Sequence, residues 1–211
     1  MYETNFFNID NKLTELDKRA LERSEKQFER IDSITEYNQL KVLKAFIKNG
    51  VSESSFAGST GYGYDDRGRE VLEKVMADCM GAEDSLIRHN FVSGTHTLTV
   101  ALFGVLRPGD KVICLTGRPY DTITGVFGID EKTDGSLADF GVKYSQVELK
   151  ADGTPDIEEI KRVLRNEKPK MAYIQRSRGY STRPSLKIAD IEVIIKAIKE
   201  TSPESIIMVD N

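Results

Sequence analysis

The first fifty residues place apolar side chains at helical spacing among charged ones, a pattern typical of amphipathic helices. Ser33, followed three residues later by Glu36, has the pattern of a capping box and predicts that a second helix begins there. Gly50 can end that helix. We therefore expect a helical segment over residues 1–50, made of two helices that pack on the following domain or on a partner subunit.

Residues 51–68 interrupt this pattern, and their glycines and tyrosines predict a loop. Short apolar runs then alternate with amphipathic segments. The alternation predicts helices over residues 69–80, 93–105, 120–126, 156–164 and 188–199, and strands over residues 85–88, 111–115, 142–147, 171–174 and 206–209. Short apolar strands alternating with helices are typical of an α/β fold, so we expect a mainly parallel sheet covered by helices.

Composition narrows the class of protein. Of 211 residues, 39% are hydrophobic and 30% charged, as in soluble globular proteins. The net charge of -4 gives no general reason to expect a nucleic-acid partner. No run of about 18 apolar residues is present, so we expect no membrane span. The N-terminus lacks signal-peptide features and two cysteines make no disulfide framework, so we expect a cytoplasmic location.

The sequence offers little for metal or serine-hydrolase chemistry. His89 and His96 are the only histidines and have no other ligands at suitable spacing, so we expect no metal site. No Gly-x-Ser-x-Gly motif is present, which argues against a Ser-His-Asp triad. In parallel sheets, ligands bind where strands end and the following helices begin. The loops after the predicted strands are therefore the places to search.

Two of these loops suggest a ligand with an anionic group and a flat ring. Ser93, Gly94 and Thr95 precede an apolar helix, and the first turn of a helix can bind a phosphate or carboxylate. The alternative is that Ser93 only caps the helix and Gly94 makes a tight turn. Tyr120, in the loop 117–122, either stacks on a ligand ring or is a half-buried tyrosine with a hydrated hydroxyl.

A third loop, 175–183, lies in a basic part of the chain. Residues 165–187 contain seven lysines and arginines against one glutamate. Arginines in such a loop suit a carboxylate or phosphate, because the guanidinium pairs with either bidentately. A solvated loop or salt bridges between subunits explain them equally well, and nucleic acid is a weaker alternative. Asp210 follows four apolar residues and is either a helix N-cap or a fixed anion facing a protonated ligand atom.

Five strings of the chain resemble the aluminium-resistance proteins, a branch of the cysteine/methionine-metabolism lyases with fold type I and pyridoxal phosphate as cofactor. The strings are FAGSTGYGYDDRGRE (56–70), VSGTH (92–96), GRPYDT (117–122), QRSRGYSTRPS (175–185) and VDN (209–211). The resemblance covers nearly all of the chain from about residue 37 onward. It implies a small amino-acid substrate, a homo-dimer or homo-tetramer, and a cofactor-binding large domain of which residues 51–211 are the N-terminal part.

Matched position by position, the resemblance also implies roles for single residues. Ser93, Gly94 and Thr95 would hold the cofactor phosphate. Tyr120 would stack on the pyridine ring, and Asp210 would pair with the pyridinium nitrogen. The resemblance thus implies that Tyr120 and Asp210 are the catalytic residues of this chain.

Five further residues are implied as cofactor contacts. Gln175 and Ser177 would lie at the same site, although the related lyases carry different residues in that stretch. Tyr62, Tyr64 and Arg67 belong to a glycine-rich loop that, in related lyases, reaches the phosphate bound by a neighbouring subunit. This loop is a further reason to expect an oligomer.

The family's remaining active-site parts are expected beyond this sequence. The lysine that binds the cofactor covalently follows the Asp-Asn pair in the family, and this sequence ends at Asn211. We therefore expect the N-terminal half of a carbon–sulfur lyase, inactive by itself, whose intact form carries out β- or γ-elimination. An aldolase or aminotransferase would use the same cofactor residues. The sequence also allows a non-catalytic fragment that binds a phosphorylated ligand, or an interaction role in metal tolerance.

Overall fold

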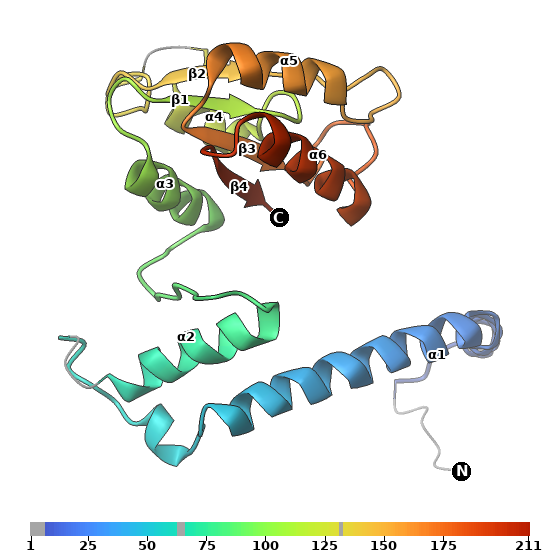
Figure 1. The fold of residues 1–211 in the computed structure, drawn as a ribbon. Coiled ribbons are helices and arrows are strands. Elements are labelled where there is room, and N and C mark those ends of the chain that lie inside the picture. The colour runs from blue at the N-terminus through green and yellow to red at the C-terminus, as the bar shows by residue number, and fades with distance from the viewer. Residues whose placement is uncertain (1–6, 63–65, 131–132) are drawn as a thin grey trace. The chain divides into compact units, whose positions relative to one another are not determined.

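The computed structural model describes residues 7–62, 66–130 and 133–211, and the chain forms two compact units, residues 1–89 and 90–211 (Figure 1). The sequence suggested a boundary near residue 50, whereas the division between the two compact units falls after residue 89 of the chain. The assignment of residues 51–211 to a cofactor-binding large domain stays a prediction. Within the described ranges, no helix combines the length and the apolar character needed to cross a membrane.

In the first unit, one long helix replaces the two that the sequence predicted. Helix α1 (Asn11–Lys48) is capped by Asp10, whose carboxylate accepts a backbone hydrogen bond. The predicted helix start at Ser33 is wrong, because the Ser33 hydroxyl donates to the carbonyl oxygen of Glu29 at 3.0 Å. A serine bonded to the carbonyl four residues back is accommodated within a continuous helix. The helix ends just before Gly50, which has a φ of +62°.

The unit continues with the short 3-10 helix η1 (Glu53–Phe56) and helix α2 (Arg67–Met80). The strand predicted over residues 85–88 is wrong, because this segment has no strand partner and is irregular. Its polar groups are satisfied by Glu73 of α2 instead: the amide of Ile87 donates to the Glu73 carboxylate at 3.0 Å. A backbone segment that finds side-chain acceptors in this way needs no neighbouring strand.

The second unit is a four-stranded sheet between helices. Its elements in chain order are α3 (Gly94–Val105), β1 (Lys111–Cys114), α4 (Asp121–Phe127), β2 (Lys143–Gln146), α5 (Ile157–Glu167), β3 (Met171–Gln175), α6 (Ile188–Thr201) and β4 (Ile206–Asp210). The strand order is β2-β1-β3-β4, and each neighbouring pair is parallel. The predicted fold class, a parallel sheet covered by helices, is therefore confirmed.

Each face of the sheet packs against two helices. Because alternate residues of a strand point to opposite faces, Ile113 and Ala172 pack with α5 and α6. Cys114 and Tyr173 pack with α3 and α4 on the other face. Both central strands are almost fully buried, as expected for a parallel sheet between two helical layers. The two cores hold the ends of β1 and β3 in fixed positions, and the loops that leave them carry the candidate site.

Candidate functional site

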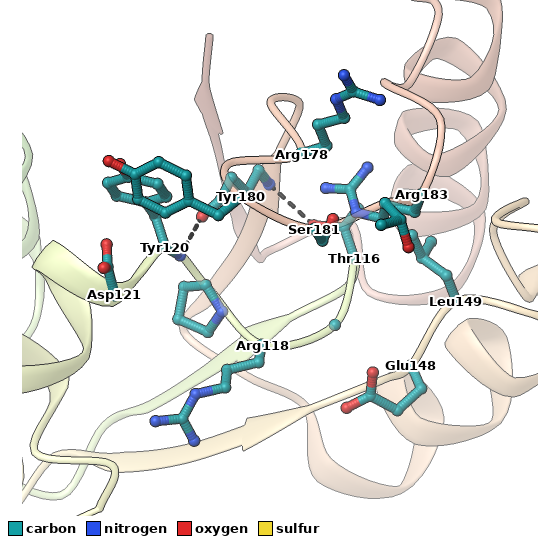
Figure 2. Close-up of a pocket in the computed structure, with 14 residues that line it drawn as sticks. Thr116, Arg118, Tyr120, Asp121, Glu148, Leu149, Arg178, Tyr180, Ser181 and Arg183 are labelled. Atoms are coloured by element: carbon teal, nitrogen blue, oxygen red, sulfur yellow. Dashed lines mark hydrogen bonds between the residues drawn. The ribbon is translucent and has the colours of Figure 1, made fainter.

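The carboxyl ends of β1 and β3 form the point at which the strand order reverses. The strand after β1 lies on one side of this central pair, and the strand after β3 lies on the other side. Ligands of open α/β sheets bind in the crevice at such a point. A pocket of about 600 Å³ opens there (Figure 2). Its lining comes from three strand exits and includes Thr116, Arg118, Tyr120, Glu148, Gln175, Arg178, Tyr180 and Arg183.

Gln175, the last residue of β3, connects the two central loops of this crevice. Its side chain is nearly buried, with the residue 4% exposed. The amide oxygen Oε1 accepts a hydrogen bond from the backbone amide of Tyr120 at 2.5 Å, and Nε2 donates to the carbonyl oxygen of Ser177 at 3.0 Å. The backbone amide of Gln175 donates to the hydroxyl of Thr116 at 3.0 Å. A buried amide with both polar atoms satisfied is rigid, so Gln175 positions the Tyr120 loop.

The ring of Tyr120 is held at the pocket wall by the loop after β3. The Tyr180 ring lies 5.7 Å away between centroids, with 31° between the ring planes. The backbone of Gly179 lies so close that a Cβ there would fall 2.6 Å from Cδ2 of Tyr120. The neighbouring Tyr180 side chain, and to a smaller extent burial, raise the pKa of Tyr120 to about 12. The phenol is therefore neutral at physiological pH, and the orientation of its ring is set by the loop.

The contact between Gly179 and Tyr120 predicts a large cost for a small substitution. Gly179→Ala is expected to lower the free energy of unfolding by ~2–4 kcal/mol, because alanine is strained at a φ of +56° and its Cβ displaces the Tyr120 ring. Gly135→Ala is the matched control, since Gly135 has a φ of +78° and nothing within 4 Å of its Cβ position. It should cost ~1 kcal/mol. Urea unfolding measures both, and equal losses would show that the ring contact constrains nothing.

Asp210 ends β4 on the face of the sheet that α3 and α4 cover. It follows Met208 by two residues, and Met208 packs into the core on that face. The buried hydroxyl of Tyr173 donates to Oδ2 of Asp210 at 2.9 Å. Burial and the neighbouring Asp210 carboxylate raise the pKa of Tyr173, so the phenol stays a hydrogen-bond donor to the carboxylate. The pair fixes the position of a half-buried carboxylate at the carboxyl edge of the sheet.

The start of α3 leaves two backbone donors free of acceptors within the helix. Ser93 is the N-cap, and its hydroxyl oxygen accepts from the amide of His96 at 3.1 Å. The amides of Gly94 and Thr95 lie in the first turn, where the helix supplies no acceptor. The Thr95 hydroxyl donates to that of Thr122 at 3.2 Å, so the starts of α3 and α4 lie side by side. The first turn of α3 can therefore bind an anion.

The predicted site residues of the second unit thus fall into two groups. Tyr120 and Gln175 line the pocket. Residues 93–95 and Asp210 are outside its lining and lie toward the face covered by α3 and α4. Ser177 contributes its carbonyl oxygen, which accepts from both Gln175 and an arginine of the same loop. Direct contacts of these residues with a cofactor stay predictions.

The other predicted residues belong to the first unit. Tyr62 is exposed, and the guanidinium of Arg67 donates to the carbonyl oxygen of Gly50 at 3.4 Å. Tyr64 lies outside the described residues. Among the residues that the structure describes, no group of three or more His, Cys, Asp or Glu side chains is placed to hold a metal ion.

Sequence reasoning missed Tyr173 and Thr116, which position the residues it did find. A signal for Tyr173 was present, because a buried tyrosine in an apolar strand usually needs a hydrogen-bond partner for its hydroxyl. Thr116 lies two residues after β1, and a hydroxyl at a strand exit can bond to the neighbouring strand. Neither signal names the partner, which depends on the order of the strands.

Several known proteins are similar to this chain in sequence and structure. The model of the methionine gamma-lyase family matches residues 13–211. A carbon–sulfur lyase involved in aluminium resistance from Clostridium novyi NT is 42% identical with a TM-score of 0.88, over 100% of this chain and 51% of that chain. A candidate cystathionine β-lyase involved in aluminium resistance from Clostridium acetobutylicum is 46% identical with a TM-score of 0.88, over 98% and 50%. The uncharacterized Bacillus subtilis protein YnbB is 44% identical over 182 residues, 86% of this chain and 43% of YnbB.

The same fold extends to more distant proteins. The pyridoxal-5'-phosphate-dependent protein YhfS from Escherichia coli has a TM-score of 0.61 at 17% identity, over 82% of this chain and 43% of that chain, which shows the fold alone. The chain spans about half the length of the relatives it matches. The family match covers nearly the whole chain, and the structural relatives confirm the resemblance to aluminium-resistance proteins. The chain belongs to the methionine gamma-lyase family.

Proposed function

We propose that the intact protein is a pyridoxal-phosphate-dependent carbon–sulfur lyase that acts on a sulfur-containing amino acid by β- or γ-elimination. The position of Asp210 is the observation that supports this most. Its carboxylate ends β4 on the same sheet face as the start of α3, whose first amides are free, and the start of α4, which follows Tyr120. An anion site, an aromatic ring and a carboxylate at one sheet edge fit a flat, phosphorylated ligand with a ring nitrogen.

The residues of this chain would bind and orient that cofactor. The amides of Gly94 and Thr95 would hold the phosphate, and the Tyr120 ring would lie against the pyridine. Asp210 would hold a proton on the ring nitrogen, with Tyr173 fixing the carboxylate. The cofactor, when bound, supplies an electron-withdrawing ring that stabilises negative charge at the substrate α-carbon. Negative charge at the α-carbon leads to the elimination of a thiol. Residues that bind and orient this cofactor therefore suit a lyase.

The proposal extends to the assembly. We infer from the resemblance that Tyr62, Tyr64 and Arg67 contact the phosphate bound by a neighbouring subunit of a homo-dimer or homo-tetramer. The exposed position of Tyr62 is compatible with contact to another chain. A small amino-acid substrate and a cytoplasmic location belong to the same proposal.

Cofactor affinity and product analysis of the full-length protein test the proposal. Pyridoxal phosphate should bind more tightly than pyridoxal, because the helix-start amides recognise the phosphate. The protein is incubated with L-methionine, L-cystathionine or L-threonine. From either of the two sulfur-containing amino acids it should release a thiol, ammonia and a keto acid. Cofactor binding is measured by fluorescence and products by thiol and keto-acid assays.

The products distinguish a lyase from other enzymes that use the same cofactor. Transfer of the amino group without thiol release would indicate an aminotransferase, and cleavage of threonine to an aldehyde would indicate an aldolase. Equal affinity for pyridoxal and pyridoxal phosphate, or no turnover of any of the three amino acids, would contradict the assignment as a lyase.

A further inference from the structure

Helix α1 carries an apolar stripe that its own unit leaves uncovered. The members of the stripe recur at helical spacing, cover about a third of the helix circumference and are each between 39% and 59% exposed. They are Leu13, Leu16, Phe28, Ile31, Ile34 and Val42. Within the first unit, Ala45 is the one buried residue of this 38-residue helix. Most of the stability of a helix in a protein comes from packing of its apolar face, so the stripe needs a partner.

Helix α2 cannot be that partner, because its bonds to α1 lie at the end of the helix. There Lys48 and Asn49 both donate to the carboxylate of Asp78 in α2. The N-terminal half of α1 extends beyond α2 (Figure 1). The stripe therefore calls for a surface outside the first unit.

The length of the stripe favours another long helix as its partner. From Leu13 to Val42 it is about 44 Å long at 1.5 Å per residue. A compact domain of the size of residues 90–211 is roughly 35 Å across, so it would cover the stripe in part. A hollow of about 580 Å³ lined by α1, with Ile34 and Phe46 among its residues, lies at the C-terminal part of the stripe. Side chains of a packed helix fit into grooves of this kind.

Charged side chains of opposite sign flank the stripe. Along one side, at helical spacing, are the basic residues Lys12, Arg19, Arg23, Arg30 and Lys41. Along the other side are the acidic residues Glu25, Glu29, Asp32 and Glu36. Lys18 is the exception on the acidic side. A surface with this pattern is complementary to a second copy of itself.

The order of the charges also favours one orientation of that second copy. In a parallel pair of helices, one flank of each helix meets the opposite flank of the other, as g and e positions do in a coiled coil. The basic flank of each copy would then lie against the acidic flank of its partner. An antiparallel pair would instead set like charges together, which is unfavourable. Asn38 lies within the stripe and would face its own counterpart in a parallel pair, where a polar residue fixes the register.

We infer that the stripe of α1 pairs in parallel with the same stripe of a second copy of this chain. The inference rests on the homo-oligomer of the proposed function and assigns a surface on which that oligomer forms. It involves none of the residues proposed to contact the cofactor, so it can be tested separately from the chemistry.

Sedimentation analysis of the full-length protein over a range of concentrations tests whether this surface holds two copies together. Ile31→Glu places a charge in the stripe of both copies and should raise the dissociation constant of the pair about 30-fold or more. Leu40→Glu is the matched control, because Leu40 is 59% exposed against 54% for Ile31. Leu40 lies about two and a half turns further on, which places it on the opposite side of the helix. The control should change the dissociation constant less than about 3-fold.

Cysteine crosslinking tests the parallel orientation. Ser24→Cys and Val42→Cys, made separately, each place a thiol opposite its own counterpart in a parallel pair, so mild oxidation should give a covalent dimer of both variants. In an antiparallel pair a residue meets its own counterpart near a single point of the helix, so at most one of the two variants would crosslink. The wild-type protein, with Cys79 and Cys114, gives the background.

The outcomes separate this inference from the proposed function. A wild-type oligomer that persists unchanged in Ile31→Glu would overturn the inference alone. So would a loss of thermal stability in Ile31→Glu without a change in assembly, because the stripe would then pack within its own chain. Failure of either cysteine variant to crosslink would overturn the parallel arrangement. A monomeric wild-type protein would contradict the proposed assembly together with the inference, while the product assays decide the lyase activity independently.

Discussion

Asp210→Asn is expected to lower the turnover number of the intact protein about 100- to 1000-fold, the loss typical when a group that stabilises developing charge is removed. Asparagine has the shape of aspartate but carries no charge, so it cannot hold a proton on a ring nitrogen. The fold should tolerate the change, because the asparagine oxygen can still accept from the Tyr173 hydroxyl, which lies 2.9 Å from Oδ2 of Asp210. Steady-state kinetics and thermal unfolding measure the two effects separately.

Tyr173→Phe is the companion variant for this result. It removes the hydrogen bond to Asp210 and leaves the charge. We expect a loss of turnover of about 10-fold or less, because a positioning bond is worth less than the charge it positions. Since burial and Asp210 raise the pKa of Tyr173 above its ordinary value, the tyrosine should act as a donor throughout the usual assay range. Wild-type turnover in Asp210→Asn would refute the proposed pairing of this carboxylate with the cofactor.

Phe127→Ala is expected to lower the free energy of unfolding by ~3–5 kcal/mol, the range for removal of a buried aromatic ring. Phe127 is 1% exposed and lies between two tyrosine rings, with its centroid 5.2 Å from that of Tyr144 and 5.6 Å from that of Tyr173. Alanine would leave a cavity in the core between the sheet and helices α3 and α4. Denaturant unfolding of the variant measures the loss.

Phe140→Ala provides the matched control for the same chemical change. Phe140 is 54% exposed and makes one edge-to-face contact, with Phe103 at 5.7 Å between centroids. Its removal should cost ~1 kcal/mol, because little apolar surface is returned to water. A loss as large as that of Phe127→Ala would show that exposure is a poor guide to stability in this unit. A loss below ~1 kcal/mol for Phe127→Ala would contradict the packing described for this core.

Local patterns predicted most elements of the second unit but failed at two positions in the first. Asp156 was expected to begin a helix, and its carboxylate does accept from the amide of Glu159 at the start of α5. Ser33 has the same kind of local pattern and caps nothing, because its hydroxyl finds a carbonyl within a continuous helix. The segment 85–88 has strand-like composition, yet its hydrogen-bond donors find acceptors on Glu73 and not on a neighbouring strand. A local pattern indicates which hydrogen bonds a residue can form. The partners that the fold brings near it determine which of these bonds form.

The candidate site was predictable where it follows from chain order. Tyr120 and Gln175 were expected in strand-exit loops, and the structure brings both to one pocket. The role of Gln175 was not predictable, because its contact with Tyr120 spans 55 positions. The side-chain oxygen and nitrogen of Gln175 bond to the loops after β1 and β3, and a local sequence motif cannot show these contacts.

The sequence by itself determined the alternation of strands and helices, the buried runs of the parallel sheet and the residue types at each strand exit. Periodicity and turn chemistry are local, so they can be read without knowing the fold. Only the tertiary structure decided that Asp210 meets Tyr173, 37 positions away, and that the backbone of Gly179 lies against the Tyr120 ring. These contacts depend on the strand order β2-β1-β3-β4 and on which face of the sheet each strand end presents. Strand order is set by long-range packing, which no local pattern in the chain encodes.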